Sequence, residues 1–192
     1  MFMTIGIDEV GRGCWAGPLV AAAVGFDNAI TPPVGLNDSK KLSPKKRIEL
    51  TTMIHAATTH IGVGWVWPKE INKLGLTKSV KLAMVRAIKV LQLENASIII
   101  DGNINYLQHL PNTTAVVKAD GSVAAVSAAS IIAKVARDTY MINIAKKYPQ
   151  FGFEKHVGYG TKQHVAALKK YGVLSLHRVN YKPIQKILAG SS

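Results

Sequence analysis

The chain has 192 residues, and 48% of them are hydrophobic, which excludes the composition of a disordered protein. Its 24 Lys and Arg residues outnumber 11 Asp and Glu residues, for a formal net charge of +13. This excess favours a polyanionic partner such as nucleic acid, although a basic surface that contacts only solvent would have the same composition.

The first half of the chain predicts three strands and two helices. Short apolar runs bounded by turn residues predict strands at residues 2–7, 19–26 and 60–67. Ser43 followed by Pro44 is a typical helix start, because serine caps the first turn and proline fits the first helical position. A second helix is expected from a cap at Thr77 to about residue 93.

The second half predicts two more strands and two more helices, at residues 96–100, 114–118, 123–147 and 162–171. Thr161 is expected to cap the last of these helices, which Gly172 ends. A surface tail is expected from about Ile187. This mixture of strands and helices predicts an α/β fold, and the length favours a single domain over residues 1–192.

Four acids follow predicted strands: Asp8 and Glu9 after the first, Asp101 after the fourth and Asp120 after the fifth. Strand ends are where α/β proteins build sites, so we expect these acids to meet. Clustered carboxylates repel one another unless cations neutralise them, and oxygen ligands select Mg²⁺ or Mn²⁺. Two such ions can hold a scissile phosphate. Alternatively, any one of these acids could be a helix cap or half of an ion pair.

Asp138 is a further acid, 18 residues beyond Asp120. If one helix connects them, the rise of about 1.5 Å per residue separates the two carboxylates by more than about 20 Å. We therefore expect Asp138 to be a helix-surface or structural acid.

A glycine turn and two basic segments are candidate substrate contacts. Gly11-Arg12-Gly13 follows the first acids, and such a turn lets the backbone approach an anion. Lys40 and Lys41 lie in NDSKKLSPKKR, residues 37–47, which could contact phosphates or only solvent. Tyr159 lies between two glycines, near Lys155, and could stack on a sugar or base or pack on the domain as a turn residue.

The remaining reactive side chains show no catalytic spacing. Cys14 is the single cysteine, which excludes an intrachain disulfide and a cysteine-based zinc site and favours a packing role. The six histidines lack metal-ligand spacing, so we expect them to be structural or exposed. The start MFMTIGIDEV does not have the pattern of a signal peptide. A cytoplasmic protein without membrane contact is expected.

Long segments of the sequence closely resemble the bacterial ribonuclease HII family. They are GIDEVGRGCWAGPLVAAAV, LNDSKKLSPKKR, IIIDGN, KADGSVAAVSAASIIAKVARD, YPQFGFEKHVGYGTKQH and HR at 177–178. The resemblance implies a ribonuclease H-like fold: a five-stranded mixed sheet flanked by helices, with a small helical C-terminal part at about 150–192 that binds substrate.

The resemblance also implies an activity and its residues. The activity is hydrolysis of the RNA strand of RNA–DNA hybrids and incision on the 5′ side of single ribonucleotides in duplex DNA. The implied catalytic and metal-binding acids are Asp8, Glu9, Asp101 and Asp120. The Gly11-Arg12-Gly13 turn and Tyr159 would recognise the junction between a ribonucleotide and deoxyribonucleotides.

From these residues we expect two-metal-ion catalysis with Mn²⁺ or Mg²⁺, in which Lys40, Lys41 and Lys155 hold backbone phosphates. A monomer is the expected state. A contact with a sliding clamp through IQKIL, residues 184–188, is a weaker possibility.

Some positions depart from the family pattern, and two other functions stay open. KAD stands where KGD is common, Val157 replaces a frequent lysine, and HRVNY replaces HRxSF, so that Asn180 and Tyr181 put any contact of that serine in doubt. The open functions are nucleic-acid binding by a degraded site and two-metal cleavage of DNA junctions.

Overall fold

A computed structural model describes residues 3–27, 29–91 and 96–190. Its centre is one five-stranded sheet in the order β3-β2-β1-β4-β5. β1 pairs antiparallel with β2 and parallel with β4, so the sheet is mixed, as predicted. The strands are β1 (Met3–Val10), β2 (Leu19–Asp27), β3 (Ile61–Val66), β4 (Ala96–Asp101) and β5 (Thr113–Val116).

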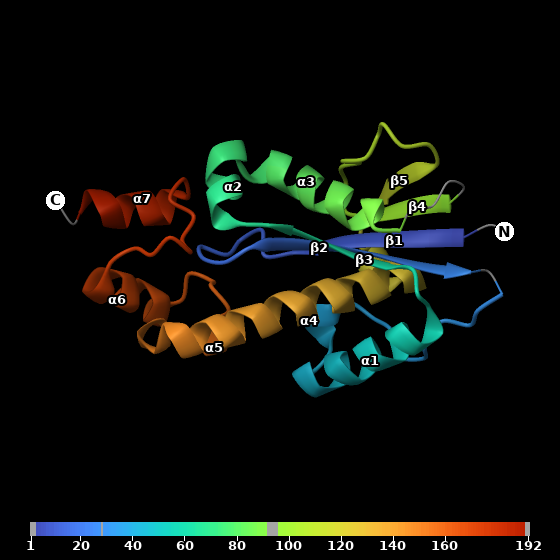
Figure 1. Ribbon diagram of the computed structural model, residues 1–192, viewed down its shortest axis with the longest axis horizontal. Coiled ribbons are helices and arrows are strands. Elements are labelled where there is room, and N and C mark those ends of the chain that lie inside the picture. Colours follow the sequence, from blue (N-terminus) through green and yellow to red (C-terminus); the bar gives the residue numbers. More distant parts are fainter. Residues whose placement is uncertain (1–2, 28, 92–95, 191–192) are drawn as a thin grey trace.

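Helices cover both faces of the sheet, with α2 and α3 on one side and α1 and α4 on the other (Figure 1). The α-helices are α1 (Pro44–Ala57), α2 (Pro68–Leu74), α3 (Leu76–Lys89), α4 (Ala124–Lys147), α5 (Phe153–His156), α6 (Lys162–Tyr171) and α7 (Lys182–Ala189). Short 3₁₀ turns are η1 (Ser39–Lys41), η2 (Ala119–Gly121) and η3 (Pro149–Phe151). Among the described helices, none is long and apolar enough to cross a membrane.

The central strand β1 separates two apolar cores. Ile5 and Ile7 point toward α3 and join one buried cluster, whereas α4 packs with β2 and α1 in the other. Gly6 lies on the α4 face, where an added Cβ would lie 2.1 Å from the main chain of Ala125. The missing side chain therefore lets the first turn of α4 lie directly on β1.

β3 also has glycines where a helix packs closely against it, here on the face that α3 covers. Gly62 and Gly64 face α3, and a Cβ at either position would lie about 2 Å from a carbonyl oxygen of that helix. The large residues that alternate with them, Ile61, Val63 and Trp65, pack against the opposite core. The alternation of large and small residues thus sets how closely each helix layer approaches.

The C-terminal elements form a third buried cluster around the end of α4. Phe151, Phe153 and Leu168 pack there with Ala16, from the loop between β1 and β2. Ile184 of α7 is fully buried in the same cluster. Because α7 continues to Ala189, the expected start of a surface tail near Ile187 is wrong.

Most predicted elements are present, although the bounds of several differ from the prediction. The helix expected from Thr77 instead starts at Leu76, because Gly75, with φ of 76°, separates it from the unpredicted helix α2. β1 continues to Val10, so Asp8 and Glu9 lie inside the strand and not after it. The fifth strand ends at Val116, two residues early.

We expect Gly64→Ala to destabilise the protein, because the added Cβ would lie 2.0 Å from the Ala83 carbonyl oxygen. The free energy of unfolding should fall by about 1–3 kcal/mol, measured by denaturant titration. Gly121→Ala is the matched control, since the nearest atoms to its Cβ are 4.0 Å away. Equal stability of the two variants would contradict the close packing of α3 on β3.

Candidate active site

The pairing of β1 with β4 brings two acids together. In this parallel pair Ile7 lies opposite Ile100, so the residues that follow, Asp8 and Asp101, lie side by side. Asp120 reaches them from η2, which lies between β5 and α4. One carboxylate oxygen from each of the three acids lies within 4.8 Å of the others. We call Asp8, Asp101 and Asp120 the three-acid cluster.

Burial makes this cluster electrostatically costly. Asp8 and Asp120 are only 7% and 6% exposed. Burial, followed by the charges of Glu9 and Asp101, raises the pKa of Asp8 to about 8, although a hydrogen bond from Ser130 opposes the shift. Burial and the neighbouring Asp101 charge likewise raise the pKa of Asp120. The ionised cluster is therefore unfavourable without a compensating positive charge.

The three-acid cluster fits a hard divalent cation. Oδ1 of Asp101 is buried and has no hydrogen-bond partner among the described residues. Such an atom loses its hydration without compensation, unless an ion binds it. Three converging carboxylates form the oxygen-only ligand set that Mg²⁺ or Mn²⁺ prefers.

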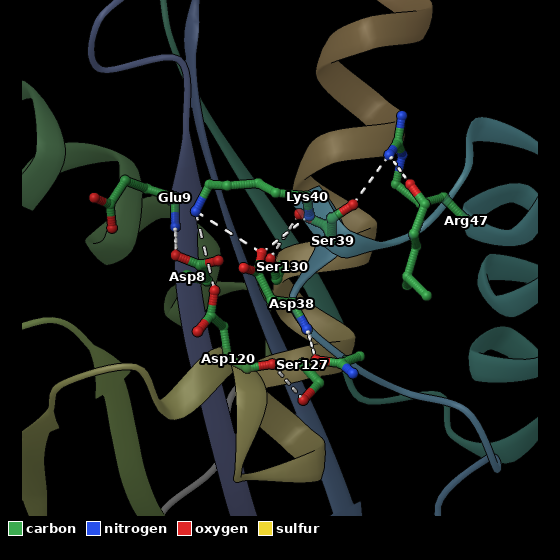
Figure 2. Close-up of polar contacts among 11 residues, drawn as sticks. Asp8, Glu9, Asp38, Ser39, Lys40, Arg47, Asp120, Ser127 and Ser130 are labelled. Carbon is green, nitrogen blue, oxygen red and sulfur yellow. Dashed lines mark hydrogen bonds and ion pairs between the residues drawn. The ribbon is translucent and has the colours of Figure 1, made fainter.

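Glu9 is not part of the three-acid cluster. Its side chain leaves β1 on the side opposite Asp8 (Figure 2), as expected for adjacent residues of a continuing strand. Its carboxylate accepts a hydrogen bond of 3.0 Å from Arg12 Nη1. Burial nevertheless raises the pKa of Glu9 above its usual value, against the effect of Arg12. Its role as a fourth metal ligand stays a prediction.

The loop that contains η1 lies over the three-acid cluster. Ser130 of α4 hydrogen-bonds to Asp8, and its hydroxyl lies 2.9 Å from that of Ser39. Arg47 Nη1 donates to the carbonyl oxygens of Ser39 and Leu42, which fixes this loop (Figure 2). Neither serine nor Arg47 was predicted as a site residue from the sequence, although all three lie in segments that carry the resemblance.

The predicted lysines lie at different distances from the three-acid cluster. The Lys40 ammonium is 4.0 Å from Asp120 and 3.9 Å from Asp38. Lys41 Nζ lies 4.0 Å from the position of a Cβ at Gly121, next to Asp120. Lys155 instead lines a separate cavity of about 340 Å³ with Lys134 and Asp138.

Asp138 has an ion-pair role on α4. Its carboxylate lies 2.9 Å from Lys134 Nζ and 3.9 Å from Arg47 Nη2. It lies outside the three-acid cluster, which agrees with the expectation of a structural acid.

Two buried arginines hold the glycine turn. Gly11 has φ of 93°, and a Cβ there would lie 2.4 Å from Arg137 Nε. Arg137 donates to the carbonyl oxygens of Ala16 and Pro18 beyond the turn. The Arg12 carbonyl oxygen accepts hydrogen bonds from Arg178 Nη1, at 3.1 Å, and from the Tyr181 hydroxyl, at 2.7 Å. These partners were not predicted from the sequence, because they are far from the turn along the chain.

Tyr159 shares a pocket of about 80 Å³ with Asp8, Glu9 and Lys40. Its ring is 41% exposed and lies 3.7 Å from the position of a Cβ at Gly13. Its hydroxyl hydrogen-bonds to the Cys14 thiol, which is fully buried as its predicted packing role requires. Tyr159 therefore lies between Asp8 and Glu9, with which it shares the pocket, and Gly13 of the glycine turn. Asn180 instead donates to the Asn72 carbonyl oxygen, on the neighbouring surface.

Comparisons with known proteins agree with this geometry. A ribonuclease HII from Vibrio campbellii is 48% identical over 187 residues, which cover 97% of this chain and 87% of that protein. The crystal structure of ribonuclease H2 from Pyrococcus horikoshii has a TM-score of 0.82 and 28% identity, over 98% of both chains. The structure of the PCNA:RNase HII complex from Archaeoglobus fulgidus has a TM-score of 0.78 and 29% identity, over 94% of this chain and 95% of that one.

The predicted ribonuclease H-like fold is confirmed by these structures. The sequence profile named Ribonuclease HII matches residues 5–184, which include the three-acid cluster, the glycine turn and Tyr159. With this match over most of its length, the chain belongs to the ribonuclease HII family of metal-dependent nucleases.

Proposed function

We propose that the protein hydrolyses the RNA strand of RNA–DNA hybrids and incises duplex DNA on the 5′ side of single ribonucleotides. The observation that carries this proposal is the three-acid cluster, whose Asp8 lines a pocket with Tyr159, in a chain of net charge +13. A cation-binding centre within a basic protein suits a phosphodiester substrate. Products would carry a 3′-hydroxyl and a 5′-phosphate.

Asp8, Asp101 and Asp120 would hold two Mg²⁺ or Mn²⁺ ions, with Glu9 as a further ligand. When bound, such ions lower the pKa of a water molecule and stabilise the leaving oxygen. The protein's part is to fix the ligands: Ser130 orients Asp8 through its hydroxyl, and Lys40 partly offsets the Asp120 charge. The buried, unpaired oxygen of Asp101 supports its assignment as a ligand.

Arg12 and the backbone N–H groups of Gly11 and Gly13 would contact the junction, where the 2′-hydroxyl distinguishes RNA from DNA. Their rigid support by Arg137 and Arg178 favours this role, since a fixed turn discriminates small differences in a sugar. Tyr159 would pack on the deoxyribose side. Lys40 and Lys41 would hold phosphates near the acids, and Lys155 would hold one at the separate cavity that it lines with Lys134 and Asp138.

We also propose a domain organisation, a cellular location, an oligomeric state and a partner contact. Residues from about 150 onward would form the substrate-binding part of a single domain that acts as a cytoplasmic monomer. A clamp contact through residues 184–188 draws support from the Archaeoglobus fulgidus complex. The packing of this segment weakens the case for a clamp contact, because Ile184 is buried and Ile187 packs on the third cluster. Leu188 is 44% exposed and accessible to a partner.

Cleavage mapping tests the proposed substrate most directly. A DNA duplex with one ribonucleotide should be cut once, on its 5′ side, when Mg²⁺ or Mn²⁺ is present, and not when EDTA is added. An all-DNA duplex of the same sequence should stay intact. Cleavage of the all-DNA control would favour a DNA-junction nuclease, and binding without cleavage would favour a degraded site.

Asp8→Asn should lower kcat on that duplex by at least about a hundredfold, because it removes a metal ligand. Binding of the duplex in EDTA should change little. Asp27→Asn is the control, since Asp27 pairs with Met3 at the opposite end of β1, and its activity should equal that of the wild type. Full activity of Asp8→Asn would remove Asp8 from the mechanism.

The raised pKa of Asp8 predicts a pH-dependent stability without metal. Between its unfolded value of 3.8 and its folded value of about 8, the folded protein binds the extra proton, so the free energy of unfolding falls as pH rises. In EDTA, the Tm advantage of Asp8→Asn over the wild type should therefore grow from pH 4 to pH 8.

Mn²⁺ or Mg²⁺ at pH 8 should then raise the wild-type Tm more than that of Asp8→Asn, because the ions bind the folded cluster. Thermal melts across pH, with and without metal, measure both effects. A Tm difference that is constant with pH in EDTA would contradict the electrostatic cost assigned to Asp8.

A further inference from the structure

Three buried histidines lie beneath the loop that carries Tyr159. The rings of His156 and His164 stack with their centroids 4.7 Å apart, and those of His164 and His177 are 5.2 Å apart. Phe151 and Phe153 enclose them on the side of the third cluster. The proposed mechanism gives these histidines no role.

The hydrogen bonds of His164 and His177 run in one direction. His177 Nδ1 lies 2.8 Å from the Leu174 N–H, which can only donate, and 3.2 Å from the Leu174 carbonyl oxygen, which already accepts from the His177 N–H at 2.9 Å. We assign the shorter bond, in which Nδ1 accepts. A neutral His177 then carries its proton on Nε2, which lies 3.0 Å from His164 Nε2. His164 Nε2 must accept this proton, which leaves the proton of His164 on Nδ1.

The hydrogen bond at the Tyr159 end leads independently to the same tautomer of His164. His164 Nδ1 lies 2.9 Å from the Tyr159 carbonyl oxygen, which can only accept. A proton on Nδ1 is therefore required at this end as well. Burial lowers the pKa of both His164 and His177 to about 4, so both rings are neutral near pH 7. We call His164 and His177, bonded in this order, the histidine relay.

The histidine relay ends on the main chain of Tyr159. The Tyr159 N–H donates to the His156 carbonyl oxygen at 2.8 Å, so both polar groups of its backbone meet histidines. Gly158 and Gly160 on either side pack closely, since a Cβ at Gly158 would lie 2.3 Å from the Ala16 carbonyl oxygen and one at Gly160 would lie 2.1 Å from the Trp15 ring. The direction of the Tyr159 ring is therefore set by these two backbone bonds together with the Thr161 N–H, which also donates to the Tyr159 carbonyl oxygen at 2.9 Å, and the bond of the Tyr159 hydroxyl to the Cys14 thiol.

Arg178, the residue after His177, holds the glycine turn, which is the other proposed substrate contact. Arg178 donates to the carbonyl oxygens of Arg12 and Gly17, while its neighbour His177 reaches Tyr159 through His164. An isolated β-bridge also pairs His177 with Ala16, which lies in the loop after the glycine turn. Residues 177 and 178 thus fix the position of Tyr159 relative to the glycine turn.

We propose that His164 and His177 are positioning residues that orient Tyr159 for the sugar next to the ribonucleotide. This inference rests on the proposed function, in which Tyr159 packs on substrate. His164 acts by donating to the Tyr159 carbonyl oxygen, and His177 acts by keeping the His164 proton on Nδ1.

Histidine tautomers in the unmodified protein give the first test. Two-dimensional ¹H–¹⁵N NMR of the imidazole nitrogens at pH 7 should show His164 protonated on Nδ1 alone and His177 on Nε2 alone. The opposite tautomer at His164, or a doubly protonated ring at either position, would overturn the relay. This test uses the unmodified protein without substrate, so its result does not depend on whether a variant folds.

Two variants of His164 separate positioning from stability. His164→Phe keeps a ring but removes the donor, whereas His164→Asn has a smaller side chain whose amide can replace Nδ1–H. We expect His164→Phe to weaken binding of the single-ribonucleotide duplex in EDTA by about five- to tenfold, the effect of one lost hydrogen bond. His164→Asn should bind like the wild type, even with a lower Tm. Affinities that follow the order of Tm would indicate a merely structural role.

A double-mutant cycle with Tyr159→Ala tests whether His164 acts through Tyr159. In that background His164→Phe should have no further effect on affinity, and additive losses would overturn the proposal. His55→Phe is the matched control, because His55 is exposed on α1.

Hydrogen exchange separates failure of this inference from failure of the proposed function. The amides of residues 157–161 should exchange faster in His164→Phe than in His55→Phe, whatever the substrate. Unchanged exchange overturns the relay. A wild type that fails to cleave the single-ribonucleotide duplex, or that cleaves the all-DNA duplex as well, would instead contradict the proposed function.

Discussion

Repulsion among Asp8, Asp101 and Asp120 is the constraint on which the site depends. Their oxygens lie within 4.8 Å of one another, and two of the acids are almost fully buried. Among the partners described, the Ser130 hydroxyl gives a neutral hydrogen bond and the Lys40 ammonium approaches Asp120 only to 4.0 Å. These contacts do not offset three clustered negative charges, two of which are buried. The geometry is therefore best explained as a receptor for divalent cations.

The fold holds this unfavourable arrangement by close packing of α4 on the sheet. Gly6 lets the helix lie directly on β1, which brings Ser130 to Asp8. Farther along the same helix, Arg137 lies under Gly11 and bonds to the loop beyond the glycine turn. One helix thus positions both the acids and the turn that would present substrate to them. Residues 177 and 178 add the link to Tyr159.

Local patterns were sufficient to predict much of the fold and the meeting of three acids. Apolar runs located the strands, and parallel neighbours bring the acids at their ends together, as for Asp8 and Asp101. The direction of Glu9 was not predictable in this way, because it depends on β1 continuing to Val10. That extension comes from pairing with Val20 and Ala21 of β2, which the apolar run does not reveal.

Contacts between distant residues account for most of what the sequence did not predict. Tyr181 reaches the Arg12 carbonyl across 169 residues, and neither residue type signals the other. The histidine relay has no regular spacing, because its order is set by backbone groups of Leu174 and Tyr159. Helix α7 is short, and the burial of Ile184 against other elements stabilises it more than any local pattern.

The most direct measurement of the central claim is anomalous diffraction from a crystal of the protein soaked in Mn²⁺. We expect an anomalous peak within about 2.0–2.3 Å of oxygens from Asp8, Asp101 and Asp120. A well-occupied crystal whose three carboxylates turn away from one another, with no manganese between them, would contradict it.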